Sequence, residues 1–563
     1  MPKKFSFPCG CKFDVIDDSD PDRILLDFTP DVESMQFDCT RTWGLFADGD
    51  TKGIFQLESP LGRSISQKLK PNNINELSAL IAILRPGCME SIIDGKTITQ
   101  HYIDRKHGLE EVTYYHPILK NSLSETYGLL VYQEQAMKIT QDVANFDLQQ
   151  ADTLRRAIGK KLVDEMTKVK TMFLKKAKEV GVVSVDEAEE IFSWIEKSQR
   201  YSFNKSHSMS YAYNGYQSAF CKAHFTRAFF TSYLYFAKEN KKANPRSEIR
   251  DLINNAKTAN ISVKLPDLRK LFTTSLIPGL KPCLHSMLRN KHIYIGLSDV
   301  KEVGIDAMDK MIRYIEKLEK SSGVSFEDFT WEFLLIHCVS KIKKTVFVAL
   351  IEVGALDYLG HSRTTMLRDY EKFKEGITGK YELLWMQEHY KCNSSLVDAL
   401  QDMIDAGTGE GKGIYSKKRL MVIQDIVTAM KHPSYSMVDN PAWIVGVEEA
   451  RIGVALSHTK VETRDISAAN TTCREFVDGK SGYIILACQI NSVNVIKTKS
   501  GKNPGQEMAF VTASDESCPL ENVVIFPDTY KEFGGMLIDG NTVMLGGERG
   551  RENGLIVKKV WQI

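Results

Sequence analysis

The chain has 563 residues, more than the roughly 250–300 that one hydrophobic core usually supports, so we expect several domains. Its composition, 43% hydrophobic and 26% charged, is that of a globular protein and excludes a disordered or fibrous chain. The 73 Lys and Arg residues balance 72 Asp and Glu residues to a net charge of +1, which excludes a simple polycation and leaves nucleic-acid contact to local basic patches.

The cysteines and the N-terminus indicate a cytoplasmic setting. The 11 cysteines are odd in number and spread along the chain, and a chain of this length needs no disulfide scaffold. The apolar stretch after Lys3 and Lys4 is too short for a signal peptide and is interrupted by Pro8. No apolar run reaches the roughly 18 residues of a membrane helix, so we expect no membrane partner.

The first part of the chain is predicted to be helical after an irregular start. Residues 1–50 are rich in prolines and acidic residues, and we expect an irregular segment. In residues 51–240 apolar side chains recur at helical spacing, and Asp147 precedes a helix that runs to Gly159. This pattern predicts one large helical domain.

The remaining chain is predicted to form a second helical module and a barrel. Residues 241–405 combine helices with two short strands, and 406–480 combine a glycine-rich linker with helices. Residues 481–563 contain five short β-branched runs between turns, at 483–487, 509–512, 522–526, 542–545 and 554–557. The expected fold is therefore multidomain, mainly α, with a C-terminal all-β barrel of the OB type.

Three cations lie close together on the helix that follows Asp147. Arg155 and Arg156 are adjacent and Lys160 follows one turn later, so their side chains can converge on one anion. Guanidinium groups form paired hydrogen bonds to phosphate, and an ammonium group adds charge. We predict a triphosphate-binding cluster; the alternative is a solvated basic helix end, which the helix dipole also favours.

A polar cluster lies between aromatic residues at 203–208. Asn204, Lys205, Ser206 and His207 occupy a loop or helix start, where backbone N–H groups point outward and favour phosphate. Tyr211 follows one helical turn later, a combination suited to base and sugar contact. We predict a nucleotide-binding segment, with a structural histidine as the alternative.

Other basic residues are candidate DNA contacts. Arg85, Arg105 and Lys106 are predicted to contact DNA, with ordinary surface charge as the alternative. Lys497, Lys499 and Lys502 flank one turn of the expected barrel, where a charged groove could hold a single strand. Aromatic residues are sparse there, so a purely structural barrel stays open.

The segment 296–304 resembles a helix-hairpin-helix turn. Its Val-x-x-Val-Gly ending, at Val303 and Gly304, enters a predicted helix whose first N–H groups can grip a phosphate without reading sequence. A weaker echo at 349–357 ends in Gly-Ala-x-Asp, and its alternative is an ordinary helix with a glycine C-cap.

Taken in order, these segments resemble a known family. The series begins with Gly-Ile-Phe-Gln-Leu-Glu-Ser and runs through 53–59, 80–87, 102–108, 116–117, 126–135, 151–161 and 203–208. It is similar to the fingers region of the C-family DNA polymerases, the bacterial DNA polymerase III alpha subunits, most densely from Thr51 to Leu234. The resemblance implies dNTP and primer-template DNA as ligands, with Ser206 and His207 near the sugar of the incoming nucleotide. It also implies that the irregular residues 1–50 are either a remnant of a palm domain or a surface that docks to one.

The same resemblance implies catalytic groups that we do not find in this chain. Family members hold two Mg²⁺ ions with three palm aspartates. Lys12-Phe13-Asp14 is similar to the segment that carries the third carboxylate, but Asp14 lies closer to Phe55 than the family pattern expects. The Asp-x-Asp strand and the phosphoesterase-like domain are not found. The chain starts with Met1 and reads as a whole gene product, so we expect a second polypeptide, as in phage genomes, to carry the palm and the magnesium ligands.

Neither a resident metal nor a clamp motif is expected from the sequence. Cys9, Cys11 and Cys39 raise the possibility of a metal knuckle, but Cys-x-Cys is poor zinc spacing and the first histidine is His101, so no metal ligand is assigned. A sliding clamp is a possible partner, yet its usual Gln-x-x-Leu-Phe peptide is not found, and 400–404 is more simply a helix.

Two classes of function follow. In the first, the chain is the nucleotide- and DNA-binding part of a replicative DNA polymerase in a bacterial or phage-infected cytoplasm. In the second, it is a non-catalytic DNA-binding or regulatory relative of such a polymerase. A neighbouring gene for an Asp-x-Asp palm discriminates between them.

Overall fold

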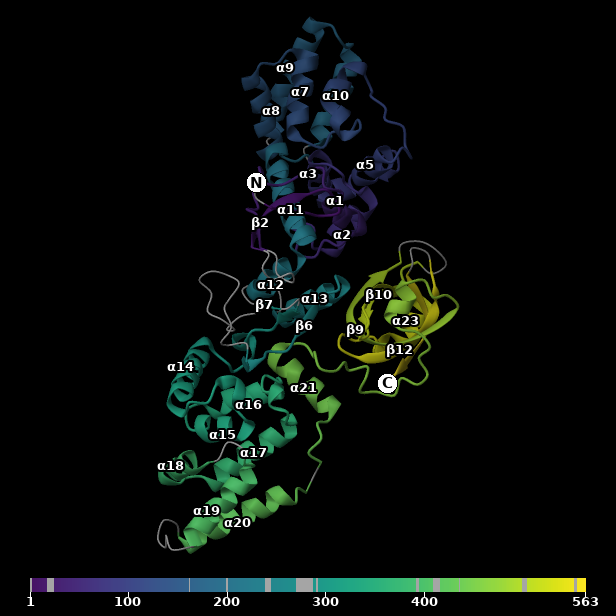
Figure 1. Cartoon of the computed structure of the whole chain (residues 1–563). Coiled ribbons are helices and arrows are strands. Elements are labelled where there is room, and N and C mark those ends of the chain that lie inside the picture. Colours follow the sequence, from purple (N-terminus) through teal and green to yellow (C-terminus); the bar gives the residue numbers. More distant parts are fainter. Residues whose placement is uncertain are drawn as a thin grey trace. The chain divides into compact units, whose positions relative to one another are not determined.

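In this computed structural model the described residues are 3–17, 25–160, 163–198, 201–237, 245–269, 287–289, 292–390, 394–408, 416–434, 436–498, 504–550 and 554–563. They form two compact units, Met1–Phe229 and Phe230–Ile563 (Figure 1). No helix in the described ranges is both long enough and apolar enough to cross a membrane.

The first unit begins with a small antiparallel sheet in place of the irregular segment expected for residues 1–50. Strands β1 (Lys4–Ser6), β2 (Lys12–Asp17) and β3 (Leu25–Asp27) pair in that order, and helix α1 (Thr40–Asp48) follows. The β1–β2 turn is tight because Gly10 has a φ of 92°, a conformation in which L side chains are strained. Aromatic packing, rather than local strand propensity, stabilises this sheet. The Phe13 ring centroid lies 5.3 Å from that of Phe28 and 5.5 Å from that of Phe225.

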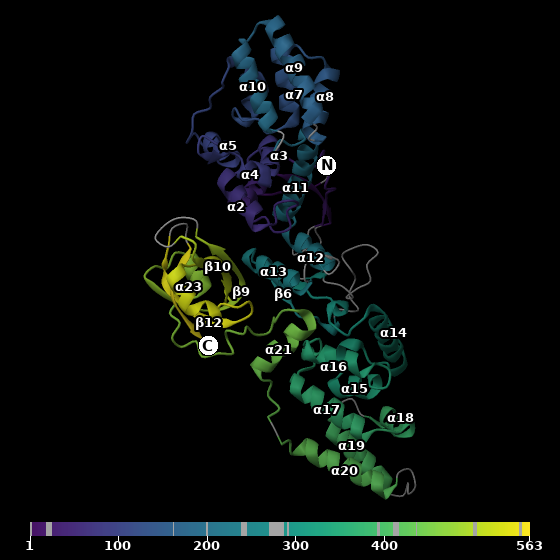
Figure 2. The same ribbon diagram turned by 180° about the vertical axis from the view of Figure 1, so that it is seen from behind.

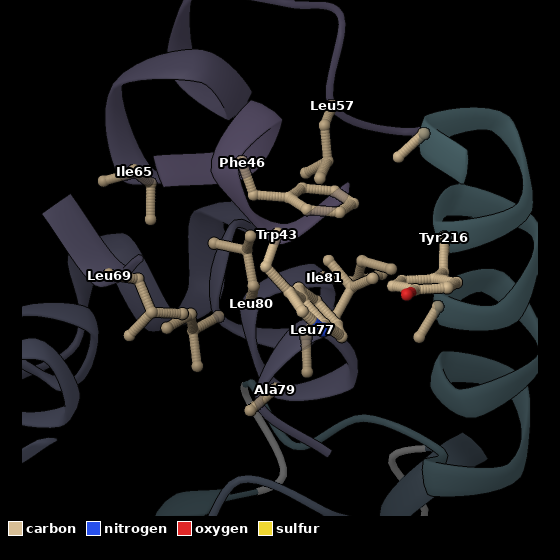
Figure 3. Close-up of a cluster of buried hydrophobic side chains, with 14 of the residues drawn as sticks. Trp43, Phe46, Leu57, Ile65, Leu69, Leu77, Ala79, Leu80, Ile81 and Tyr216 are labelled. Carbon is tan, nitrogen blue, oxygen red and sulfur yellow. The ribbon is translucent and has the colours of Figure 1, made fainter. Parts of the chain in front are cut away.

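The main core of the first unit surrounds helix α3 (Ile74–Ile83). Asn73 caps α3 by accepting the N–H of Glu76 at 3.0 Å, and residues 76–83 are all buried. Helix α11 (Lys205–His224) packs along α3, and its Tyr216 ring lies beside Trp43 with the ring centroids 4.8 Å apart (Figure 3). The other elements around this core are α2 (Pro60–Leu69), α4 (Pro86–Glu90), β4 (Ile92–Ile93), β5 (Lys96–Thr97) and α5 (Ile98–Lys106).

A second core in the same unit joins four helices. Helix α7 (Gln133–Ala144) and helix α8 (Leu148–Lys160) are linked by three residues and pack closely, as an antiparallel hairpin must. Asp147 caps α8 through the N–H of Gln150 at 2.8 Å, as the sequence predicts. Figures 1 and 2 show α9 (Val163–Val180) and α10 (Val185–Ser198) beside this hairpin; the short α6 (Lys120–Leu123) precedes it.

The second unit starts with helices and a small mixed sheet. Strand β8 (His292–Tyr294) pairs parallel with β6 (Ser262–Lys264) and antiparallel with β7 (Met287–Arg289). The helices are α12 (Thr226–Ala237), α13 (Pro245–Thr258), α14 (Ile305–Ser322), α15 (Trp331–Cys338), α16 (Lys344–Glu352), α17 (Arg363–Gly376), α18 (Lys380–His389), α19 (Leu396–Thr408), α20 (Lys417–Lys431), α21 (Pro441–Ile452) and α22 (Cys473–Val477).

The chain ends in the expected barrel. Its strands are β9 (Tyr483–Lys497), β10 (Glu507–Ser514), β11 (Pro519–Ile525), β12 (Thr542–Arg549) and β13 (Leu555–Gln562), with α23 (Pro527–Phe533) after the third. They close in the order β10-β11-β13-β12-β9, and only β11 and β13 pair in parallel. This is the strand order of an OB fold, so the prediction of a mainly α chain with an OB-type barrel is confirmed.

The Gly-Ala-x-Asp echo has a structural explanation in the second unit. Gly354 ends α16 with a φ of 72°, and Asp357 accepts Nη2 of Arg363 at 2.8 Å. Arg363 is only 2% exposed and also meets the fully buried Glu448, Nη1 to Oε1, at 2.8 Å. Removing one member of a buried ion pair leaves the other charge uncompensated in a poor solvent.

We therefore predict that Arg363→Ala lowers the free energy of unfolding of this module by about 3–5 kcal/mol. Urea denaturation followed by tryptophan fluorescence measures the change, because Trp331 is buried in the same module. The control is Lys372→Ala, which removes a half-exposed ion pair with Glu375 and costs at most about 1 kcal/mol. Equal losses in the two variants contradict this assignment.

Candidate functional site

The N-terminus of α11 is held in place by the start of α7. Asn204 caps α11 by accepting the N–H of His207 at 2.8 Å. Glu134 on α7 accepts Asn204 Nδ2 at 2.9 Å and the Lys205 N–H at 2.8 Å. The predicted nucleotide-binding segment is therefore a rigid helix start and not a free loop.

A partly exposed row of rings extends along α11 from this start. His207 and Tyr211 are four residues apart on α11 and share one helix face, and Phe203 directly precedes the N-cap residue Asn204. Ring centroids are 5.5 Å apart for Phe203–His207, 4.1 Å for His207–Tyr211 and 5.0 Å for Tyr211–Phe55. We call these four residues the aromatic row; such stacked faces suit base or sugar contact.

Arg85 extends the aromatic row at its Phe203 end. Its guanidinium carbon lies 3.8 Å from the centroid of the Phe203 ring, a cation–π contact. Arg85 is exposed and is the N-cap of α4. A residue that the sequence assigns to DNA thus lies beside the predicted nucleotide segment, where a phosphate could reach it.

Lys205 and Ser206 differ in availability. Lys205 Nζ pairs with Glu125 Oε2 at 2.6 Å and lies 5.8 Å from the Tyr132 ring, with a side chain 33% exposed. Ser206 is exposed. The sequence did not predict the acidic partners of this segment, Glu125 and Glu134. Glu134 lies within the motif 126–135 and Glu125 directly precedes it.

Arg155 and Arg156 pair with a neighbour on their own helix. Asp152 accepts Arg155 Nη2 at 2.7 Å and Arg156 Nε at 3.3 Å, and both arginine side chains are at least a third exposed. Within the described side chains neither arginine contacts the aromatic row. Lys160 ends α8, and its side chain lies outside the described residues.

The hairpin geometry places these arginines at the same end as the α11 start. Because α7 and α8 run antiparallel, the C-terminal half of α8 returns alongside the N-terminal half of α7. Glu134, in the first turn of α7, is the residue that binds Asn204. The two predicted segments therefore both lie near the N-terminal end of α7, one on α8 and the other at the start of α11.

Arg105 and Lys106 do not present the DNA contacts that the sequence suggests. Arg105 Nε meets Glu110 at 2.6 Å and its Nη1 donates to the Tyr127 carbonyl at 3.0 Å. Lys106 Nζ meets Glu76 at 2.6 Å, with a side chain only 8% exposed. Both cations pair with acceptors inside the first unit because α5 packs into the first core. They therefore stabilise the fold.

Asp14, the carboxylate that resembles the third palm aspartate, does not belong to a group of three or more potential metal ligands among the described residues. Asp14 lies on β2 with Lys4 Nζ 3.5 Å from its Oδ1, and its side chain is 42% exposed. In the described part of the chain, the group of three or more potential metal ligands that the fold assembles is Cys9, Cys11, Cys39 and His224, without a carboxylate. Mg²⁺ prefers oxygen ligands, so this thiol and imidazole set is unsuited to it.

The cysteine cluster combines residues that the sequence separates widely. Cys39 Sγ lies 3.3 Å from His224 Nε2, across 185 positions of chain. Burial opposes ionisation of Cys39, but hydrogen bonds, the largest from His224, outweigh it and lower the pKa of this thiol. Burial raises the pKa of the Cys11 thiol above its ordinary value. The sequence argument against a metal relied on the absence of a nearby histidine, and the fold supplies His224 from the end of α11.

The second unit places its predicted DNA contacts unevenly. Gly304 is the N-cap of α14, Val303 is buried in the preceding turn, and a Cβ on Gly304 would meet nothing within 4 Å, so this helix start is open to a ligand. Lys497 is exposed at the end of β9, opposite Glu507. Lys499 and Lys502 lie outside the described residues.

The described chain combines a helical domain that has exposed cations and stacked rings with a turn that enters α14 at Gly304 and a C-terminal OB-type barrel, an arrangement suited to binding nucleic acid. Family comparison agrees: residues 24–181 match the bacterial DNA polymerase III alpha subunit finger domain, and residues 260–366 match a helix-hairpin-helix motif. The first match contains Arg85, Arg155 and Arg156 and ends before α11.

Curated relatives extend the similarity beyond these two domains. The chain is 28% identical over 521 residues to DNA polymerase III subunit alpha of Bacillus subtilis (strain 168), covering 92% of this chain and 41% of that protein. It is 34% identical over 333 residues to the Aquifex aeolicus (strain VF5) subunit, covering 59% and 26%. It is 28% identical over 543 residues to the Staphylococcus aureus (strain MSSA476) subunit, covering 94% and 43%.

The chain is therefore related to the C-family DNA polymerase alpha subunits and corresponds to the part that carries their finger and helix-hairpin-helix domains. It spans about two fifths of the Bacillus and Staphylococcus relatives and about a quarter of the Aquifex relative.

The Arg105 network makes a pH-dependent contribution to stability. Burial of Glu110 opposes its ionisation, but hydrogen bonds from Arg105, His101 and Lys96 outweigh burial and lower its pKa to about 2. A folded-state pKa below the unfolded value of about 4.3 gives stability that is present above about pH 4.3 and is lost as pH falls toward about 2.

We predict that Glu110→Gln lowers the free energy of unfolding at neutral pH and that the difference from the parent chain shrinks steadily below about pH 4.3. Urea titrations at several pH values measure both effects. The control Glu111→Gln changes an exposed neighbour and is expected to follow the parent chain at every pH. A difference that grows on acidification has the wrong sign for this network.

Proposed function

We propose that this chain binds dNTP and grips DNA as a component of a replicative DNA polymerase. The observation that carries the proposal is the aromatic row at the start of α11, flanked by Arg85. Arg85 belongs to residues 24–181, which match the polymerase finger domain, and α11 follows that match in the same unit. The relatives' name, DNA polymerase III subunit alpha, supports template-directed DNA synthesis as the process in which it acts.

The triphosphate is proposed to lie between two sets of groups. Arg155, Arg156 and Lys160 on α8 supply one set of cations, and Arg85 and Lys205 supply the other. Each described cation already has an acidic or aromatic partner, which holds its side chain in place before the nucleotide arrives. A charged phosphate with several oxygens can compete with one half-exposed carboxylate for such a cation.

The base and sugar are proposed to contact the aromatic row. His207 is exposed between Phe203 and Tyr211, and Asn204, Lys205 and Ser206 begin the same helix. Stacking is largely independent of base identity because every base has a π-face, so the template has to supply selection. Ser206 and His207 are the proposed neighbours of the sugar and the candidates for discrimination against ribose.

The second unit is proposed to hold the DNA backbone. The open helix start at Gly304, reached through Val303, offers N–H groups to a phosphate without reading sequence. In the barrel, exposed Lys497 and half-exposed Phe510 suit a single strand, together with Lys499 and Lys502. A sliding clamp is a further possible partner for which we find no binding peptide.

The catalytic carboxylates and their Mg²⁺ ions are proposed to belong to a palm outside these residues, carried by a second polypeptide. Asp14 alone, paired with Lys4, does not make a two-metal site. A non-catalytic DNA-binding role is the alternative function, and primer extension in the presence of a palm partner separates the two.

We expect the purified chain to bind primed template DNA but not to extend the primer when mixed with dNTPs and Mg²⁺. Extension is expected once a co-purifying palm polypeptide is added. Primer extension by the chain alone overturns the second-polypeptide proposal. DNA binding without extension in the presence of any palm partner favours the non-catalytic alternative.

We predict that Arg156→Ala raises the KM for dNTP in the extending polymerase by about 10–100-fold, because one charge-assisted hydrogen bond is worth about 1.5–3 kcal/mol. The matched control is Lys178→Ala, which removes an exposed cation from the last turn of α9. Steady-state incorporation of a single nucleotide measures KM. An unchanged KM in the arginine variant removes α8 from the nucleotide site.

A further inference from the structure

The strongest unassigned site in the described chain is the cluster of Cys9, Cys11, Cys39 and His224. One donor atom from each residue lies within 4.8 Å of the others. Tetrahedral zinc with bonds of about 2.3 Å to sulfur and about 2.0 Å to nitrogen separates neighbouring ligand atoms by about 3.5–3.8 Å. The 3.3 Å separation of Cys39 Sγ and His224 Nε2 is close to that spacing.

Each of the three segments that supply the donor atoms has a local conformation that suits metal binding. Cys9 and Cys11 flank Gly10 at the tip of the β1–β2 turn, where a φ of 92° at Gly10 lets both thiols face one side. Cys39 is the N-cap of α1, where the positive end of the helix dipole favours a thiolate. His224 is the last residue of α11.

The cluster is closed to solvent. Cys11, Cys39 and His224 are 1%, 2% and 7% exposed, and Cys9 is half-buried. Phe7 and Phe220 lie 4.7 and 4.4 Å from the His224 ring, between centroids. Four protein ligands in a closed apolar shell leave no open coordination position, which is the arrangement of structural rather than catalytic zinc.

Ordinary core packing does not explain this arrangement. The cysteines are free thiols, so no disulfide accounts for their approach. A histidine placed among phenylalanines solely for packing would be less costly as another aromatic residue.

We propose that Cys9, Cys11, Cys39 and His224 bind one structural Zn²⁺ ion. Binding displaces protons from the thiols to solvent, and three thiolates with one neutral imidazole give the bound site a net charge of about −1. Arg41 follows Cys39 by two residues, and its guanidinium carbon lies 5.7 Å from the Phe7 ring centroid, so it places a positive charge in the neighbourhood of the cluster.

The ion would join parts of the first unit that are far apart in the sequence. It ties the β1–β2 turn and the start of α1 to the C-terminal end of α11. Strand β2, which begins directly after Cys11, carries Asp14, and the other end of α11 carries the aromatic row. The zinc site does not depend on the proposed nucleotide-binding function, because its ligands lie at the opposite end of α11.

The test uses the full chain purified with a thiol reductant from zinc-supplemented medium. Mass spectrometry of the metal content is expected to find about one zinc per chain. After removal of zinc by a chelator, Co²⁺ titration is expected to produce the thiolate-to-cobalt charge-transfer absorption, and the melting temperature is expected to fall until zinc is restored. A parent chain that gives neither zinc nor a thiolate–cobalt band overturns the proposal.

Variants locate the site. Cys11→Ser and His224→Gln are expected to lose bound zinc, whereas Cys221→Ser, a cysteine one turn earlier on α11 and outside the cluster, is expected to keep it. Circular dichroism verifies that each variant is folded, and the Co²⁺ spectrum of the parent chain stands even where a variant is not. Retention of zinc by both ligand variants, or its loss from the control, places the metal elsewhere and contradicts the assignment.

Discussion

The packing of α11 against α3 is the constraint on which the first unit depends. Small residues on α11, Ala212, Gly215 and Ala219, let the helix approach the core closely, and a Cβ on Gly215 would come within 3.3 Å of the Phe55 carbonyl. Ser208 Oγ donates to the Ser78 carbonyl at 2.6 Å and fixes the register of the two helices. Because α11 is 20 residues long, it transmits this position over about 30 Å, from the candidate nucleotide segment to the cysteine cluster.

Much of this fold follows from local pattern in the sequence. The barrel strands were predictable because apolar alternation and turn residues recur over short distances. The OB strand order was predictable because only a few topologies are permitted for five strands joined by short connections. The first strands were not predictable, because β1 and β3 have three residues each and depend on rings from distant segments. His224 was missed for the same reason: 185 positions separate it from Cys39, and only tertiary packing brings them together.

The sequence alone predicted least well which cationic side chains are available to bind a ligand. In the sequence Arg105 and Lys106 look like an ordinary pair of surface cations. In the fold, Arg105 pairs with Glu110 and Lys106 pairs with Glu76. Arg85, in contrast, is exposed and stacked on Phe203 beside the nucleotide segment. Whether a cation is available depends on which acid the fold places within about 3 Å, and that pairing is set by tertiary structure.

The half-exposed ion pairs of the first unit therefore have a consequence for binding. Without an acidic partner, neighbouring cationic side chains would repel one another and lose their order. Asp152 keeps the side chains of Arg155 and Arg156 ordered, and these exposed ion pairs contribute little to the free energy of folding. In the proposed nucleotide site, an arriving triphosphate would gain a preorganised cluster and displace only a weak, solvent-screened partner. The same logic separates Arg156 from Arg105, because Glu110, the partner of Arg105, is only 20% exposed and is less screened by solvent than Asp152. Exposure of the paired acid, rather than the number of cations, thus distinguishes a cation that can bind a ligand from one that holds the fold.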